Sequence, residues 1–290
     1  MWALGVQWLP DRYLSSYHRT TILIRTRQFS SVVPKLARRS SVADLTTDSL
    51  VSDANAMPQP RILGIFAKAW DAGKVKTRLG KTLGNETAAQ VYFQLLVFHL
   101  LRFGNVGDSR VLAYSPANDE TRDRFSRLGL SLKPRPEWDF IPQVEGDLGT
   151  RMTGFFQQQL DSSDQKCRVI LIGSDTPRLS AEIVNEAFEL LADHDVVFGP
   201  SNDGGYYLVG MGTMAEAIFQ DVDWSTDRVL QQSLAICKNE GLSFATLPEL
   251  NDIDNEDDLK QELKLLGAEE DVLTEKFVQD VSSLVAGKLS

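Results

Sequence analysis

The stretch VILIGSDTP, residues 169–177, joins a short run of aliphatic residues to a polar turn. Such a run, bounded by Gly and Pro, is typical of a strand that is buried on both faces of a parallel sheet. Pro177 forces the chain to turn, and Asp175 stands just beyond the end of the strand. Because ligands of open α/β sheets bind beyond the carboxyl ends of the strands, we expect Asp175 to lie in a ligand crevice.

Similar apolar runs lie on both sides of this strand, and segments with helical spacing separate most of them. We predict further strands at residues 62–67, 110–114, 196–199, 206–209 and 242–247. We predict helices at residues 86–103, 120–128, 148–160, 181–192, 225–239 and 256–266, and an appended amphipathic helix at 269–289. This alternation predicts a three-layer, Rossmann-like α/β fold, with a mostly parallel sheet covered by helices on both faces.

The composition is that of an ordinary folded protein. The chain has 290 residues, of which 42% are hydrophobic and 24% charged, and its net charge is −10. These values argue against wholesale disorder and against a protein that coats nucleic acid. The two cysteines lie far apart without a CxxC partner, so we expect free thiols in a reducing cytoplasm. No apolar run reaches the roughly 18–20 residues of a membrane-spanning helix.

The first 56 residues differ from the rest. They carry seven basic and four acidic residues, are rich in Ser and Thr and lack sustained apolar periodicity. We interpret them as a disordered basic leader; an organellar transit peptide and a true start at Met57 are the alternatives. We therefore divide the chain into residues 1–56, a nucleotide-binding catalytic domain at 57–268 and a C-terminal helix at 269–290.

A basic loop, residues 68–79, follows the first predicted strand. It carries four cations within eleven residues, Lys68, Lys74, Lys76 and Arg78, and it also contains Gly73. Fixed cations and the amides of a glycine-containing loop offset the charge of a diphosphate. The spacing matches neither the Walker motif nor GxGxxG. We predict that this loop binds phosphate, with a solvated basic loop as the alternative.

Aspartates follow two of the later strands. Asp175 could hold a divalent cation, Mg²⁺ or Mn²⁺, that bridges diphosphate oxygens, although an Asp at a strand end is also a common helix N-cap. Asp203, Gly204 and Gly205 follow the strand at 196–199, where paired glycines allow close approach of a ligand to the backbone. The alternative is an ordinary Asp-Gly hairpin turn.

Two helix starts add weaker candidates. In the stretch 145–152, Gly146, the free amides of the first turn and Arg151 could contact a base or a phosphate, while Asp147 is equally well explained as an N-cap. The acidic stretch 252–259 also precedes a helix. We interpret it mainly as capping, with Asp252 or Asp254 reaching the site as the minor alternative.

Six motifs together resemble one family. They are FAKAWDAGKVKTRL (66–79), EGDLGTRM (145–152), LIGSDTPRL (171–179), FGPSNDGGYYLVG (198–210), DWSTDRVL (223–230) and DIDNEDDL (252–259). The set is similar to the bacterial GT-A-fold, glycosyltransferase-like proteins associated with arsenosugar biosynthesis. These are related in architecture to the guanylyltransferases that act on 2-phospholactate and on the molybdenum cofactor.

The resemblance spans roughly residues 61–265 and implies a nucleotide-diphospho-sugar transferase fold. It implies that the loop at 68–78 meets the nucleotide and that Asp175 is the metal-binding aspartate. The chain departs from the family at Trp70-Asp71, where a Pro-rich bend is usual, and at Asn255-Glu256, where Thr-Pro is common.

Two reactions and one binding role follow from these motifs. In glycosyl transfer from a nucleotide-sugar donor, a metal at Asp175 stabilises the leaving diphosphate, and Asp203 is the candidate base or acceptor-orienting group. In nucleotidyl transfer, a phosphorylated acceptor attacks a nucleoside triphosphate and pyrophosphate leaves. A non-catalytic nucleotide-binding module is the third option. The acceptor is expected to be a small molecule; its identity, the sugar, the base and the choice between monomer and homodimer stay open.

Overall fold

The computed structural model describes residues 59–162 and 165–289. The unit described here begins at Gln59. The predicted leader, residues 1–56, lies outside the described residues and stays a prediction. Among the described helices, none combines the length and the apolar character needed to cross a lipid bilayer.

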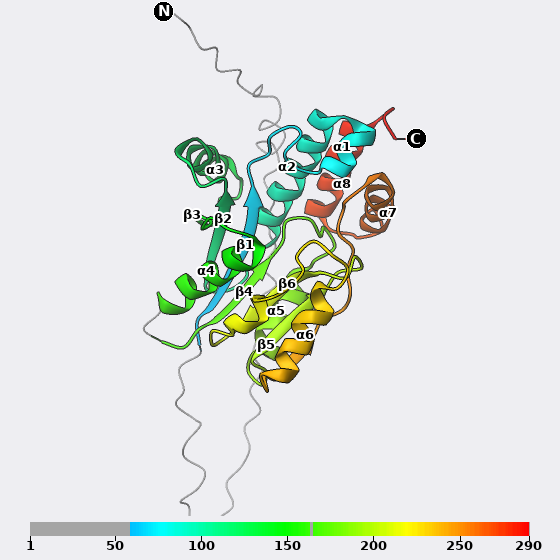
Figure 1. Ribbon diagram of the computed structural model, residues 1–290. Helices are drawn as coiled ribbons and strands as arrows, with labels where there is room; N and C mark the ends of the chain where they lie inside the picture. Colours follow the sequence, from blue (N-terminus) through cyan, green and yellow to red (C-terminus); the bar gives the residue numbers. More distant parts are fainter. Residues whose placement is uncertain (1–58, 163–164, 290) are drawn as a thin grey trace, which may run out of the picture. The chain divides into compact units, whose positions relative to one another are not determined.

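Strands and helices alternate along this unit, which confirms the predicted α/β class (Figure 1). The strands are β1 (Arg61–Lys68), β2 (Ser109–Ser115), β3 (Asp139–Pro142), β4 (Arg168–Ile172), β5 (Val196–Pro200), β6 (Tyr206–Met211) and β7 (Phe244–Thr246). The helices are α1 (Thr77–Leu83), α2 (Asn85–Arg102), α3 (Asp119–Ser131), α4 (Leu148–Asp161), α5 (Ala181–Leu190), the 3₁₀ helix η1 (Glu216–Phe219), α6 (Val229–Asn239), α7 (Glu256–Leu266) and α8 (Val272–Val285).

One seven-stranded sheet has the order β3-β2-β1-β4-β6-β5-β7. All neighbouring pairs are parallel except the two that β6 makes, with β4 and with β5. The carboxyl ends of β1, β4 and β5 therefore share one edge of the sheet, and the start of β6 lies at the same edge. This arrangement brings the loops after β1 and β4 together.

Both faces of the sheet are buried. Successive strand residues point to opposite faces, and the neighbours Ile62 and Leu63 of β1 are both buried. On one face, α4, η1 and α6 share a hydrophobic cluster with the strands. Gly64 makes the contact with α4 close, since a Cβ there would stand 2.2 Å from the Phe155 ring.

A second hydrophobic cluster joins α1, α2, α7 and α8, which gather at one side of the sheet in Figure 1. The rings of Phe98 in α2 and Phe277 in α8 stack with their centroids 4.5 Å apart. Phe277 and Val281 are fully buried. The predicted C-terminal helix is thus present, and its apolar face lies in the same core as α2.

Three elements differ from the sequence-based expectation. Helix α1 begins at Thr77, within the predicted basic loop, because Lys76 takes a left-handed conformation that ends the loop. The edge strand β3 was not predicted: it has only four residues and ends at a proline, which an edge position tolerates. Helix α6 begins at Val229 rather than at residue 225, since Ser225 has a φ of 66° that no helix accepts.

Candidate functional site

A cavity of about 440 Å³ opens at the carboxyl edge of the sheet, between the loop after β1 and the loop after β4. Its wall mixes charged and aromatic side chains. Five basic residues line it, Lys68, Lys74, Lys76, Arg78 and Arg151, together with three acidic residues, Asp175, Asp252 and Asp254. Phe66, Leu148, Tyr206 and Tyr207 give the cavity an apolar side. A cavity of this kind suits a ligand that has both a polyanionic part and a flat or apolar part.

The structure brings together five of the ten residues predicted for the site. Lys68, Lys76, Arg78, Arg151 and Asp175 line the cavity. The other five lie outside its lining; they are Gly73, Gly146, Asp203, Gly204 and Gly205. Five of the six predicted charged side chains therefore converge, whereas Asp203 and the four glycines lie in turns outside the cavity lining.

The two central residues of the site form an ion pair. Lys76 Nζ lies 2.7 Å from Asp175 Oδ1, and the Lys76 side chain is only 4% exposed. The same ammonium donates a hydrogen bond to Ile253 O at 2.5 Å. Asp175 Oδ1 receives no directed hydrogen bond from the described residues, so its contact with Lys76 is one of charge. Asp175 keeps 42% of its side chain exposed, which leaves the carboxylate accessible from the cavity.

Asp252 is the half-buried acid of the site. Its Oδ1 accepts a short hydrogen bond from the Thr176 hydroxyl. Burial, and then repulsion from Asp175, raise the pKa of Asp252 to about 7. The sequence pattern alone indicates only a minor role for this residue, because a capping motif follows it. The cap is made instead by Asn255 and Asp258, which exchange hydrogen bonds at the start of α7.

The hairpin between β5 and β6 contains Asp203. Its Oδ1 accepts hydrogen bonds from Ser201 Oγ at 2.5 Å and from Gly205 N at 2.9 Å, as in an ordinary Asp-Gly turn. Gly204 has a φ of +85°, and a Cβ there would stand 2.1 Å from Asp227 O, so close packing explains this glycine. Asp203 is exposed, and its charge makes a small contribution to the raised pKa of Asp252.

The remaining cations of the cavity differ in how firmly they are held. Arg78 Nη1 donates to Asp254 Oδ2 at 2.8 Å, although 71% of the Arg78 side chain is exposed. Arg151 Nε donates to Gly146 O, and its Nη1 reaches Gln143 Oε1 at 3.5 Å. The side chain of Lys68 is exposed. Surface ion pairs such as Arg78 with Asp254 are weak, so these side chains can turn toward a ligand.

Aromatic packing anchors the basic loop. Trp70 lies against Phe93 and Phe125, and the guanidinium of Arg124 covers its ring at 4.5 Å. Arg124 also pairs with Asp71 at 2.5 Å. Trp70 and Asp71 therefore fix the loop by contacts with α2 and α3.

The donor set fits a divalent cation that arrives with a phosphate ligand. Asp175 offers an accessible carboxylate, and Asp252 lies beside it. Among residues 59–162 and 165–289, no three His, Cys, Asp or Glu side chains gather as a self-sufficient metal site needs. Mg²⁺ is commonly held by one or two carboxylates, with substrate phosphates and water completing the shell. Two carboxylates in a cavity lined by several basic side chains match that arrangement.

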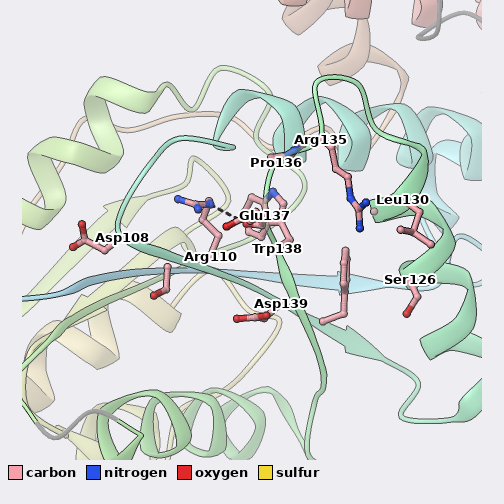
Figure 2. Close-up of a pocket in the computed structure, with 12 residues that line it drawn as sticks. Asp108, Arg110, Ser126, Leu130, Arg135, Pro136, Glu137, Trp138 and Asp139 are labelled. Atoms are coloured by element: carbon pink, nitrogen blue, oxygen red, sulfur yellow. Dashed lines mark hydrogen bonds between the residues drawn. The ribbon is translucent and has the colours of Figure 1, made fainter.

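A larger cavity, of about 850 Å³, lies at the other end of the strands (Figure 2). It opens at the starts of β2 and β3, between Asp108, Arg110 and Asp139. Arg110 is turned toward the backbone, where Nε donates to Glu137 O at 3.0 Å (Figure 2). Since this cavity faces away from the carboxyl edge of the sheet, we assign the functional site to the smaller one.

Comparison with known proteins gives a family match and a good structural likeness. Residues 103–226 match a family described as "Uncharacterized protein conserved in bacteria (DUF2064)". The match contains Asp175 and Asp203 but neither Lys76 nor Asp252. A "putative nucleotide-diphospho-sugar transferase" from Desulfovibrio desulfuricans G20 is 28% identical, with a TM-score of 0.70, over 78% of this chain and 97% of that chain. No curated protein matches the chain.

More distant likenesses are weak. The inositol-1-phosphate CTP transferase from T. maritima is 12% identical, with a TM-score of 0.43, over 79% of this chain and 97% of that chain. Rv0371c from Mycobacterium tuberculosis H37Rv is 15% identical, with a TM-score of 0.41, over 72% of this chain and all of that chain.

Proposed function

We propose that this chain is a metal-dependent transferase that takes a nucleotide-sugar donor and passes its glycosyl group to a hydroxyl of a small acceptor. The observation that carries the proposal is the cavity at the carboxyl edge, where Asp175 and Asp252 face a set of basic side chains. The likeness to the Desulfovibrio protein supports a nucleotide-diphospho-sugar donor. We expect the reaction to take place in the cytoplasm, since Cys167 and Cys237 are free thiols.

Each group of side chains has a role in this proposal. Lys68, Arg78 and Arg151 bind the donor's diphosphate, because cations on accessible side chains can close around an anion. Lys76 holds the Asp175 carboxylate in place through the 2.7 Å ion pair. The apolar side of the cavity, formed by Phe66, Leu148 and Tyr206, suits the nucleoside or the sugar ring.

Asp175 and Asp252 are the residues that would hold Mg²⁺ or Mn²⁺. When bound, the cation would offset the negative charge that develops on the leaving diphosphate. The acceptor's oxygen forms the new bond to the anomeric carbon, and the bond from that carbon to the diphosphate breaks. Asp203 is the proposed group that takes the acceptor's proton, since its Oδ2 has no hydrogen bond within the turn of the described hairpin.

A thermal-shift screen tests the proposal. Purified full-length chain is heated with nucleoside diphosphates, nucleoside triphosphates and sugar nucleotides, each with and without Mn²⁺. A ligand that binds the folded state raises the melting temperature. We expect sugar nucleotides and nucleoside diphosphates to raise it only when Mn²⁺ is present. No shift with any nucleotide would contradict the proposal.

Product analysis separates the two transferase reactions. With a sugar nucleotide that binds and a panel of small acceptors, glycosyl transfer releases a nucleoside diphosphate. Pyrophosphate release from a nucleoside triphosphate and a phosphorylated acceptor would instead assign the site to nucleotidyl transfer. Nucleotide binding without either product in the full acceptor panel would favour a binding module.

A further inference from the structure

The loop after β4 is held by polar contacts along its whole length, from Ser174 to Leu179. Ser174 Oγ lies 3.2 Å from the Tyr92 hydroxyl, and Asp175 O accepts from Ile253 N at 3.0 Å. The Thr176 hydroxyl donates to Asp252, and Thr176 O lies 3.1 Å from the His99 ring. Such a series of contacts fixes the backbone that carries Asp175.

The far end of this loop is bound by one guanidinium. Arg102 Nη1 donates to Pro177 O at 2.9 Å and to Leu179 O at 3.1 Å. Its Nη2 donates to Thr274 Oγ1 at 2.6 Å and reaches Glu269 Oε2 at 3.4 Å. The side chain is 11% exposed and lies over the Phe98 ring at 4.3 Å. Arg102 therefore joins the last turn of α2 to the Asp175 loop on one side and to the start of α8 on the other.

We propose that Arg102 is a positioning residue for Asp175, and that it couples the C-terminal helix α8 to the site through the backbone of residues 177–179. The planar guanidinium suits this role because it donates in two directions at once, which a lysine ammonium on a flexible chain does less well. The effect on metal binding rests on the proposed function, whereas the effect on the loop does not. Residues that orient metal ligands from behind commonly change metal affinity about 10- to 100-fold when they are replaced.

If Arg102 only stabilised the contact between α2 and α8, other residues of that contact should have the same effect on the site. Arg102 and Phe277 both connect α2 with α8, but only Arg102 contacts the Asp175 loop. Phe277→Leu removes part of the ring stack with Phe98 and leaves every hydrogen bond of the loop in place. It is therefore a matched control that weakens the contact of α8 with α2 without touching residues 174–179.

Hydrogen exchange of the ligand-free full chain provides the first test. In Arg102→Met the side chain keeps its apolar contact with Phe98, but two charged hydrogen bonds to the loop are lost. We expect the peptide spanning residues 173–180 to exchange at least about tenfold faster, because the carbonyls of Pro177 and Leu179 lose the charged hydrogen bonds that hold this loop. Phe277→Leu should lower the melting temperature and leave exchange of this peptide unchanged. Equal exchange of the loop in Arg102→Met and wild type would overturn the proposal.

Mn²⁺ titration followed by electron paramagnetic resonance, in the presence of a nucleoside diphosphate, provides the second test. We expect Arg102→Met to raise the dissociation constant of Mn²⁺ about tenfold, and Arg102→Lys and Thr274→Val to raise it less. If affinity instead follows melting temperature across these variants and Phe277→Leu, the role of Arg102 is structural only. If wild type binds no Mn²⁺, the proposed function fails, while the exchange result still decides whether Arg102 orders the loop.

Discussion

Lys76 Nζ and Asp175 Oδ1 lie 2.7 Å apart, so the loop after β1 and the loop after β4 meet in an ion pair whose lysine is nearly buried. The lysine has a φ of 46°, which is uncommon for a residue with a Cβ, and its ammonium also binds Ile253 O. The cation therefore occupies the space beside the carboxylate that a divalent ion would share. A free divalent ion has to bind against this positive charge.

Lys76→Met tests that competition. Removing the ammonium should tighten the binding of Mn²⁺ alone, by about tenfold or more, because a like charge in contact with the ligand carboxylate is lost. The matched control is Lys74→Met, which removes an exposed cation from the same cavity without touching Asp175. Isothermal titration of the ligand-free variants measures the effect. Weaker Mn²⁺ binding in Lys76→Met than in Lys74→Met would refute the competition.

Asp252→Asn should impair the site while the chain still folds. The amide oxygen can accept the hydrogen bond of the Thr176 hydroxyl, but the second carboxylate beside Asp175 is gone. We expect Mn²⁺-dependent nucleotide affinity to fall about tenfold or more, as for loss of a metal-binding group.

Asp203→Asn is compared with Asp252→Asn to separate a role in turnover from a role in nucleotide binding. Its carboxylate belongs to the hairpin turn and lies outside the cavity lining, so we expect it to leave nucleotide affinity unchanged and to lower turnover. Loss of nucleotide affinity in Asp203→Asn, with none in Asp252→Asn, would reverse the two assignments.

His99 predicts an acid-sensitive stability. Burial lowers the pKa of His99 from its ordinary value of 6.5 to about 4. Between these values the unfolded chain takes up a proton that the folded chain does not, so the free energy of unfolding falls as the pH drops through this window. The contribution of His99 lost by pH 4 is on the order of 3 kcal/mol. Urea unfolding measures how much the free energy of unfolding falls between pH 7 and pH 5. We expect a smaller fall in His99→Gln than in wild type, and an equal fall in both proteins would contradict this role of His99.

Truncations at the two ends should have opposite effects. Removal of residues 269–290 takes away Phe277 and Val281, which fill the core beside α2, so we expect loss of cooperative unfolding. Removal of residues 1–56 should leave the fold and nucleotide binding intact, as the composition of that segment predicts. Circular dichroism on heating compares the unfolding of the two truncated chains. A soluble, cooperatively folded 1–268 fragment would show that α8 is dispensable.

The sheet could be predicted from sequence because its central strands are long apolar runs that end in Gly or Pro turns. Strand β4, which is followed by the turn at Asp175, is the strand most readily predicted from its sequence. Strand β3 could not be found in this way, since four residues at an edge have no pattern that distinguishes them from a loop. Its pairing with β2 is decided by tertiary contacts.

The site was predictable at its charged residues and less so at its glycines. Lys68, Lys76, Arg78 and Arg151 converge because the fold places their loops at one edge. The paired glycines predict a place for a ligand at Gly204, whereas the backbone of Asp227 fills that space. The sequence does not indicate Asp252 as a main candidate, because a capping motif directly follows it and its place beside Asp175 depends on residues far apart in the sequence.

In the proposed function, Asp175 supports metal-dependent binding of a nucleoside diphosphate group at the carboxyl edge of the sheet. Calorimetric titration of a nucleoside diphosphate into wild type and Asp175→Asn, each with and without Mn²⁺, tests it most directly. We predict binding by wild type only with Mn²⁺, and none by Asp175→Asn in either condition. Equal, Mn²⁺-dependent affinity in both proteins would contradict the account.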